Sequence, residues 1–249
     1  GGTSVLKSGY TSTQQGYSLN SIFGLRYGGK IQNEEMLKAY LAKYYPNNGI
    51  GMPSNLRVGD NMYCDENGDG VLDYRDYIYL GSDTPEISYS FNAGASWKGI
   101  DFNIVFQGSA NRFVYRGIDA WTVPFRSLYT NSTTSSIGNT WSETNPNAYY
   151  NPYTTDANIV SYNYQANSLT AQDGRYIRLK NITVGYNVPA SVLKKLGFVN
   201  AARIYFTGED LWESTKITDG WDPEAKRNAS DVSRYPFTRN FTFGLNLTF

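Results

Sequence analysis

The last nine residues of this chain carry its strictest pattern. Large apolar side chains occupy every second position from 241 onward: Phe241, Phe243, Leu245, Leu247 and Phe249. Threonine, glycine or asparagine fills each position between them. Because successive side chains of a β-strand point to opposite faces, the pattern predicts a strand with one apolar and one polar face. We predict this terminal strand over residues 237–249.

Similar alternation recurs upstream, and we predict further strands over 87–97, 102–107, about 176–188 and about 202–212. The first two flank the short turn Lys98–Asp101, which predicts a hairpin with strands of about ten residues. In the segment that begins at residue 176, the apolar register slips between Leu179 and Ile182. We therefore expect a β-bulge near Lys180 and Asn181.

The connections between these strands are unequal in length. Long segments over 51–86, 110–174 and 213–236 alternate with short turns at 98–101 and 189–201. If neighbouring strands are antiparallel, every short turn lies on one side and every long loop on the other, which is typical of outer-membrane barrels. The pattern predicts an all-β chain: the C-terminal strands of a large antiparallel transmembrane β-barrel, with long extracellular loops and one or two short helices.

One short helix and one further helical turn are expected. Asn33 is a good N-cap, glutamates suit the first turn after it, and Pro46 blocks continuation. The apolar stripe of this segment predicts a helix that packs on its own loop. A single helical turn is expected between residues 191 and 196, where Gly197 ends it.

Composition excludes several classes of function. The chain has no histidine and one cysteine, so His-dependent nucleophilic triads, His-ligated metals and intrachain disulfides are ruled out. Lysine plus arginine equals aspartate plus glutamate at 22 each, which gives no basic field for nucleic acid. The adjacent pair Glu209 and Asp210 would point to opposite faces of a strand, and no phosphate-binding glycine loop is present. We expect no enzyme and no organic cofactor.

One acidic segment, residues 65–76, matches the spacing of an EF-hand calcium loop. Oxygen donors stand at the ligand positions, a glycine stands at the sixth, and the predicted ligands are Asp65, Asn67, Asp69, the backbone carbonyl of Val71, Asp73 and Asp76. Aspartate replaces the usual glutamate at the twelfth position, and no helix is evident before the loop. The alternative is an acidic turn without metal. The expected role of Ca2+ is to stiffen the loop.

Aromatic side chains are numerous, with 22 tyrosines, 12 phenylalanines and 5 tryptophans. Those near strand ends suit the membrane interface. Others lie in the long segment 110–174, where they are candidates to contact a substrate or a lid protein: Trp121, Tyr129, Trp141, Tyr149, Tyr150 and Tyr153. For each of these residues the alternative is packing within the loop.

Short motifs in a fixed order carry a family resemblance. They are Leu19–Gly24, Gly59-Asp60, the acidic loop 65–73, Lys98–Phe102, Phe106–Ser109, Tyr176–Tyr186, Leu193–Gly197, Gly208–Leu211, Gly220–Glu224 and Tyr235-Pro236. As a set they resemble the C-terminal part of a SusC/RagA-type TonB-dependent outer-membrane transporter of the Bacteroidetes. Residues 110–174 match no motif of that family.

The resemblance implies a role in uptake across the cell outer membrane. A complete family member would import glycans or oligopeptides beneath a SusD-like surface lipoprotein, with energy from a TonB-type transducer. Such a protein has a plug domain and further barrel strands before the part matched here. By this resemblance, residues 1–249 are expected to be the C-terminal part of a larger receptor.

A second interpretation has the chain as a secreted, calcium-stabilised β-sandwich that binds carbohydrate. The tyrosine and tryptophan content and the acidic loop fit both interpretations. A sandwich needs shorter strands at regular spacing of about 8–12 residues. The long connections and the apolar stripe on every strand favour the membrane barrel.

Overall fold

The computed structural model describes residues 6–8, 11–45, 47–115, 132, 134–195, 197–217, 220–225 and 238–249. The chain divides into two compact units. The loop unit consists of Gly1–Pro85, Asn111–Gly174 and Ile217–Arg234. The sheet unit consists of Glu86–Ala110, Arg175–Lys216 and Tyr235–Phe249.

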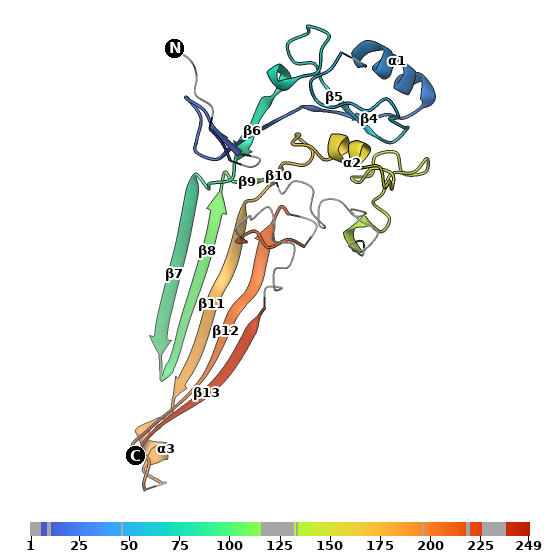
Figure 1. Ribbon diagram of the computed structural model, residues 1–249. Helices are drawn as coiled ribbons and strands as arrows, with labels where there is room; N and C mark the ends of the chain where they lie inside the picture. The colour runs from blue at the N-terminus through green and yellow to red at the C-terminus, as the bar shows by residue number, and fades with distance from the viewer. Residues whose placement is uncertain are drawn as a thin grey trace. The chain divides into compact units, whose positions relative to one another are not determined.

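The sheet unit is a five-stranded antiparallel sheet. Its strands are β7 (Ile87–Trp97), β8 (Ile100–Ala110), β11 (Tyr176–Asn187), β12 (Ala201–Thr215) and β13 (Asn240–Thr248). They lie side by side in the order β13-β12-β11-β8-β7 (Figure 1). All five predicted strands are present, and this part of the fold is confirmed as β-structure of the expected antiparallel kind.

The predicted hairpin joins β7 to β8 through a two-residue turn. Lys98 and Gly99 have φ angles of 49° and 86°, both in the left-handed region. Positive φ at both central residues characterises the type I′ turn, whose twist matches that of the flanking strands. Trp97 pairs with Ile100, so the register is set directly at the turn.

The predicted bulge is present and involves both β11 and β12. The register of β11 against each neighbour shifts between Leu179 and Asn181. Against β8, Lys180 is the extra residue, because Phe106 and Val105 pair with Leu179 and Asn181. Against β12, Lys180 faces two residues, Asp210 and Leu211, so the extra residue there belongs to β12. On β12, Asp210 has a φ of 54°, which is uncommon for a residue other than glycine. Lys180 Nζ lies 2.9 Å from Asp210 Oδ1, so an ion pair joins the two irregular positions.

Several strand boundaries differ from the predicted ones, and β8, predicted over 102–107, covers Ile100–Ala110. Strand β12 continues to Thr215, three residues beyond the predicted end at 212, because its residues beyond the bulge pair with the start of β11, as Thr215 does with Tyr176. Apolar alternation stops at the bulge, and therefore the sequence pattern could not follow the strand past it. Strand β13 covers Asn240–Thr248, within the predicted 237–249, and the predicted first residue, 237, lies outside the described residues.

The loop unit contains several small sheets. Strands β1 (Leu6–Ser8), β2 (Thr11–Thr13), β3 (Ser21–Gly24) and β6 (Ile78–Ser82) form one sheet. Strand β4 (Tyr27–Lys30) pairs with β5 (Asn61–Tyr63), and β9 (Phe113–Val114) pairs with β10 (Gln172–Asp173). These short strands lack clear alternation and were not predicted from the sequence.

The helices are short. They are α1 (Glu34–Tyr44), α2 (Ala157–Asn163) and α3 (Ala190–Leu193), with 3₁₀ turns η1 (Tyr74–Asp76) and η2 (Thr134–Ser136). In α1, the predicted cap is confirmed: Asn33 Oδ1 accepts a 2.9 Å hydrogen bond from the backbone N–H of Met36. Among the described residues, no helix has the length and apolar content needed to cross a membrane.

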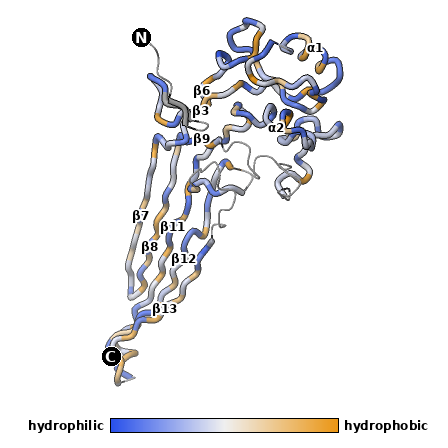
Figure 2. Tube along the Cα trace, viewed as in Figure 1, coloured by the Kyte–Doolittle hydropathy of each residue, from blue (hydrophilic) through white to orange (hydrophobic). Residues whose placement is uncertain are grey.

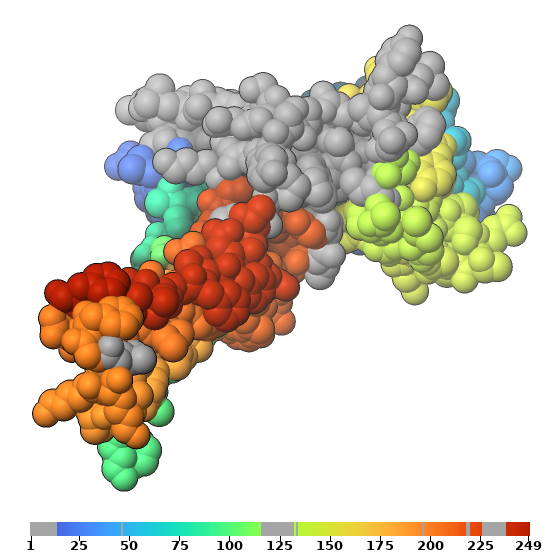
Figure 3. Space-filling view, turned by 90° about the horizontal axis from the view of Figure 1, so that it is seen from below, coloured from blue at the N-terminus to red at the C-terminus, as the bar shows by residue number. Residues whose placement is uncertain are grey.

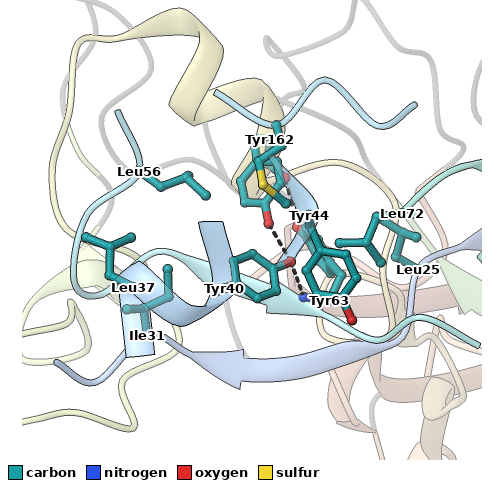
Figure 4. Close-up of a cluster of buried hydrophobic side chains, with 10 residues drawn as sticks. Leu25, Ile31, Leu37, Tyr40, Tyr44, Leu56, Tyr63, Leu72 and Tyr162 are labelled. Carbon is teal, nitrogen blue, oxygen red and sulfur yellow. Dashed lines mark hydrogen bonds between the residues drawn. The ribbon is translucent and has the colours of Figure 1, made fainter. Parts of the chain in front are cut away.

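A tyrosine-rich core holds the loop unit together (Figure 4). Helix α1 contributes Leu37, Tyr40 and Tyr44, so it packs on its own unit as predicted. The other buried members come from distant parts of the chain: Leu25, Ile31, Met52, Leu56, Tyr63, Leu72 and Tyr162. Segments 51–86 and 110–174, predicted simply as long loops, thus contribute to a packed core.

Hydrogen bonds between tyrosines satisfy the polar atoms inside this core. The hydroxyls of Tyr40 and Tyr162 lie 2.9 Å apart, and Tyr40 also accepts from the backbone N–H of Tyr63 at 2.9 Å (Figure 4). The Tyr63 hydroxyl donates to the carbonyl of Tyr162 at 2.8 Å. Burial raises the pKa of Tyr40 to about 12, so its hydroxyl stays protonated and able to donate.

Candidate functional site

One face of the five-stranded sheet is apolar and exposed. The register places Phe91 opposite Phe106, Leu179 opposite Trp212, and Phe206 opposite Phe243, all on the same face. All five residues predicted for the terminal strand are exposed, and Phe243 is 81% exposed. Figure 2 shows the mixture of apolar and polar residues along these strands. An apolar face of this extent on a soluble monomer would be unusual, and it marks an interaction surface.

The opposite face of the sheet is polar and carries ion pairs. Arg203 on β12 lies 2.5 Å (Nη2 to Oδ2) from Asp101 on β8, although β11 runs between these two strands. The pair crosses β11 at Gly185, where an added Cβ would lie 2.6 Å from Asp101 Oδ1. Glycine at this position therefore leaves the space that the ion pair fills.

A second pair and a set of hydroxyls continue this polar face. Arg178 on β11 pairs with Glu213 on β12, with Nε 3.0 Å from Oε2. Between the two ion pairs, the hydroxyls of Thr183 and Thr207 lie 3.1 Å apart. A sheet with one apolar and one hydrated, charged face suits a boundary between lipid and a water-filled space.

The predicted calcium ligands lie in the loop that follows β5 and in η1, whose last residue is Asp76. Their oxygens accept hydrogen bonds from the backbone of the same loop: Asp65 accepts from Gly68 and Gly70, at 2.7 and 2.9 Å. Asp76 is fully buried and accepts from Glu66 at 3.0 Å and from Asp73 at 2.8 Å. These bonds fold the loop into a tight turn.

A cation from the protein itself already neutralises part of this loop. The guanidinium Nη2 of Arg75 lies 2.9 Å from Asp69 Oδ2 and 2.8 Å from Asp73 Oδ2. Arg75 also lowers the pKa of Asp73, mainly through its side-chain hydrogen bond, then through its backbone N–H, and more weakly through its charge. Within the described ranges, no group of three or more histidine, cysteine, aspartate or glutamate side chains is placed to hold a metal ion. Arg75 thus pairs with two of the predicted ligands, Asp69 and Asp73, and calcium binding stays a prediction.

A buried polar network in the loop unit was missed by the sequence analysis. Asp60 is fully buried and accepts from Asn163 Nδ2 at 2.7 Å and from the backbone N–H of Arg57 at 2.7 Å. Lys30, also buried, donates to Asn61 Oδ1 at 3.3 Å. Burial lowers the pKa of Lys30 to about 8, and the negative charge of nearby Asp60 opposes this shift. Burial also raises the pKa of Asp60.

This network joins parts of the chain that are far apart in sequence. Asn61 Oδ1 accepts a hydrogen bond from Asn151 Nδ2 at 2.8 Å. Asn61 Nδ2 donates a hydrogen bond to the backbone carbonyl of Asn163, also at 2.8 Å. The only sequence signal was that Gly59-Asp60 belonged to the family motifs. Burial of a charged residue cannot be seen from a sequence without knowing what surrounds it.

The candidate aromatic contacts fall into different environments. Tyr150 is buried and packs with Tyr164, so its ring lies inside the loop unit. Trp141 and Tyr149 are partly buried, and Tyr153 is exposed. Trp121 and Tyr129 lie outside the described residues. Contact of the accessible rings with a substrate or lid stays a prediction.

Comparisons with known proteins agree with the motifs. The chain is 30% identical to the TonB-dependent receptor P3 of Formosa agariphila over 95% of this chain and 23% of that protein. It is 29% identical to the TonB-dependent receptor P26 of the same organism, over 98% of this chain. It is 26% identical to the TonB-dependent receptor SusC of Bacteroides thetaiotaomicron, over 76% of this chain and 18% of that protein. No family model matches.

Solved structures show the same fold. The structure of the RagAB peptide transporter matches 99% of this chain and 24% of that chain, with a TM-score of 0.68 and 21% identity. The RagAB peptide importer in its 'closed-closed' state matches 98% of this chain, with a TM-score of 0.63 and 22% identity. The chain therefore spans about a quarter of the length of the curated relatives and structures first matched. The resemblance predicted from the motifs is confirmed: this chain is related to the TonB-dependent receptors of the SusC/RagA family.

Proposed function

We propose that this chain forms part of a TonB-dependent importer in the cell outer membrane. The single observation that carries the proposal is the two-faced sheet. Its apolar face exposes Phe243 and its neighbours, and its other face carries the Arg203–Asp101 and Arg178–Glu213 pairs. In this function the apolar face meets lipid and the polar face lines the interior of a barrel completed by further strands. Sequence similarity to TonB-dependent receptors supports the assignment.

The proposed substrates are glycans or oligopeptides. The RagAB structures are those of a peptide transporter, and RagAB is similar to this chain in fold. By the same family reasoning, the proposed partners are a SusD-like lipoprotein on the cell surface and a TonB-type energy transducer. The role proposed for the chain itself is to form a wall of the pore and outer loops, without catalysis.

A soluble carbohydrate-binding β-sandwich is the competing proposal. In a sandwich, the apolar face of one sheet packs on a second sheet about 10 Å away. In the described part of the chain, the apolar face of the five-stranded sheet stays exposed instead. This observation favours the membrane protein.

Two measurements on cells that express the intact protein test the proposal. Fractionation should recover the protein in the outer membrane, and extraction should require detergent. Uptake of labelled oligopeptide and oligosaccharide pools should fall on deletion of the gene and on collapse of the proton gradient with an uncoupler. A protein recovered soluble and monodisperse without detergent would refute the proposal. Uptake that continues unchanged without the gene would refute the transport role.

A further inference from the structure

One end of the five-stranded sheet combines exposed rings with lysines. This end, here called the basic end, consists of the β7–β8 turn (97–100), the β11–β12 connection (188–200) and Phe249. Trp97, Phe198 and Phe249 are 68%, 68% and 72% exposed. Lys98, Lys194 and Lys195 belong to the same segments, and Lys194 and Lys195 are exposed. Figure 3 views the molecule from below, with the 188–200 connection beside the end of β13.

The charge of the basic end has one sign. Residues 97–100 and 188–200 contain three lysines and no aspartate or glutamate. The nearest carboxylate in sequence, Asp101, is already paired with Arg203. An α-carboxylate on Phe249 would offset only one of the three charges. The basic end therefore attracts anions.

The aromatic rings of the basic end lie beside lysines, as in side chains that anchor proteins at a lipid interface. Phe198 stacks on Phe249, with ring centroids 6.3 Å apart and planes 6° apart. Lys98 Nζ lies 4.6 Å from the centroid of the Trp97 ring, so charge and ring are adjacent. The apolar face continues from these rings along the strands through Leu247 and Leu245. Aromatic rings beside lysines, at the edge of an apolar face, suit the boundary between acyl chains and headgroups.

Hydrogen bonds hold the parts of the basic end in fixed positions. The backbone N–H of Asn187 donates to the carbonyl of Gly99 at 2.7 Å, which joins the two turns. The N–H of Asn200 donates to the carbonyl of Thr248 at 2.7 Å, which joins the connection to the terminal strand. The lysines are therefore presented from a rigid base, and little ordering is needed on binding.

From this arrangement we infer that the basic end binds the headgroups of anionic phospholipids. The phosphates lie against Lys98, Lys194 and Lys195, while Trp97, Phe198 and Phe249 lie at the level of the ester groups and upper acyl chains. This inference rests on the proposed membrane location of the sheet. It adds a lipid preference, which an aromatic band alone does not provide, because rings do not distinguish anionic from zwitterionic headgroups.

The test measures lipid binding to the intact protein in detergent micelles by native mass spectrometry. The probes are dioctanoyl phosphatidylglycerol, dioctanoyl phosphatidylcholine and glycerol phosphate. The wild-type protein should bind phosphatidylglycerol more tightly than phosphatidylcholine. Each lysine near an anionic surface contributes about 5-fold. The Lys194→Gln/Lys195→Gln variant should therefore lose about 30-fold in affinity for phosphatidylglycerol and little for phosphatidylcholine.

Two further variants separate charge from apolar contact. Lys38→Gln/Lys216→Gln removes the same charge from exposed lysines, on α1 and at the other end of β12, and should keep the wild-type preference. Phe198→Ser should lower the affinity of the protein for both lipids by a similar factor. Glycerol phosphate should bind far more weakly than either lipid, and binding as tight as the lipid would show a simple anion site and overturn the inference.

The outcomes distinguish this inference from the proposed function. Equal affinity of the wild-type protein for the two lipids would overturn the inference, as would equal losses in the two double-lysine variants. A separate assay records insertion of the intact protein into vesicles of phosphatidylcholine and into vesicles of phosphatidylglycerol. Insertion together with equal lipid affinities would contradict only the lipid inference. Failure to insert into vesicles of either lipid would contradict the proposed function itself.

Discussion

Gly24 allows two distant segments of the loop unit to approach each other. A Cβ on this residue of β3 would lie 2.5 Å from the carbonyl carbon of Ala166 and 2.9 Å from Leu80 Cδ1. The next residue, Leu25, is fully buried, donates to the carbonyl of Ala166 at 3.0 Å and accepts from the N–H of Ser168 at 3.0 Å. Gly24→Ala must therefore push the backbone of segment 166–168 away, because the obstacle is main chain rather than a flexible side chain.

The cost has two parts. Overpacking of a closed site costs about 1–3 kcal/mol. Loss of the bond between Leu25 and Ala166 leaves a buried N–H without its partner, at about 1–3 kcal/mol. Because the site can relax in part, we expect a total destabilisation of about 2–4 kcal/mol. This raises the equilibrium constant for local opening by about 30-fold to about 1,000-fold.

Hydrogen–deuterium exchange measured on the intact protein in detergent tests this prediction. The amides of Leu25 and Ser168 should exchange faster in Gly24→Ala by the factor above. Gly28→Ala, on β4 of the same unit, is the matched control, because its Cβ would lie 3.3 Å from the movable Cys64 sulfur. Unchanged exchange in Gly24→Ala, or equal acceleration in the control, would show that the missing Cβ of Gly24 does not hold segment 166–168 in place.

Three further predictions concern the core and the acidic loop. Tyr162→Phe removes the hydroxyl that contacts Tyr40 and should destabilise the loop unit by about 1–3 kcal/mol in denaturant unfolding, whereas the exposed Tyr17→Phe should cost almost nothing. Because Lys30 has a lowered pKa of about 8, the unfolded chain binds its proton more tightly, so stability should rise as the pH increases from 8 to 9.5. That rise should be absent in Lys30→Met. Arg75→Gln removes the internal cation of the acidic loop, and calorimetric titration should therefore show tighter calcium binding by this variant. The control, Arg26→Gln, breaks only the pair with Glu66 and should bind calcium less tightly than Arg75→Gln. The absence of binding heat in all proteins would show that the calcium prediction is wrong.

The predictable part of the fold is the part that repeats a simple period. Alternation in β7, β8, β11, β12 and β13 follows directly from the pleat, and it gave each strand without any partner being known. The slip at Lys180 even revealed the bulge, since a single extra residue reverses which face the following side chains occupy. The helix α1 was predictable because capping at Asn33 is local.

The rest depends on contacts between distant residues. Tyr63 and Tyr162 are about a hundred positions apart, and nothing local marks either as part of a core. Asp60 resembles a surface residue until its partners Asn163 and Lys30 are placed around it. In the acidic loop, ligand spacing was visible in the sequence, but the position of Arg75 between two carboxylates was not. Local periodicity therefore predicted the sheet unit well and the loop unit poorly.

Accessibility of single cysteines along β13 tests the central claim most directly. The native Cys64 is first replaced by serine, and cysteines are then placed one at a time from position 241 to position 248 in the intact protein in lipid vesicles. We expect alternation: positions 242, 244, 246 and 248 react with a charged, water-soluble thiol reagent, and positions 241, 243, 245 and 247 react only with a membrane-soluble one. Uniform reaction of all eight positions with the charged reagent would show that β13 does not have one lipid-facing and one water-facing side.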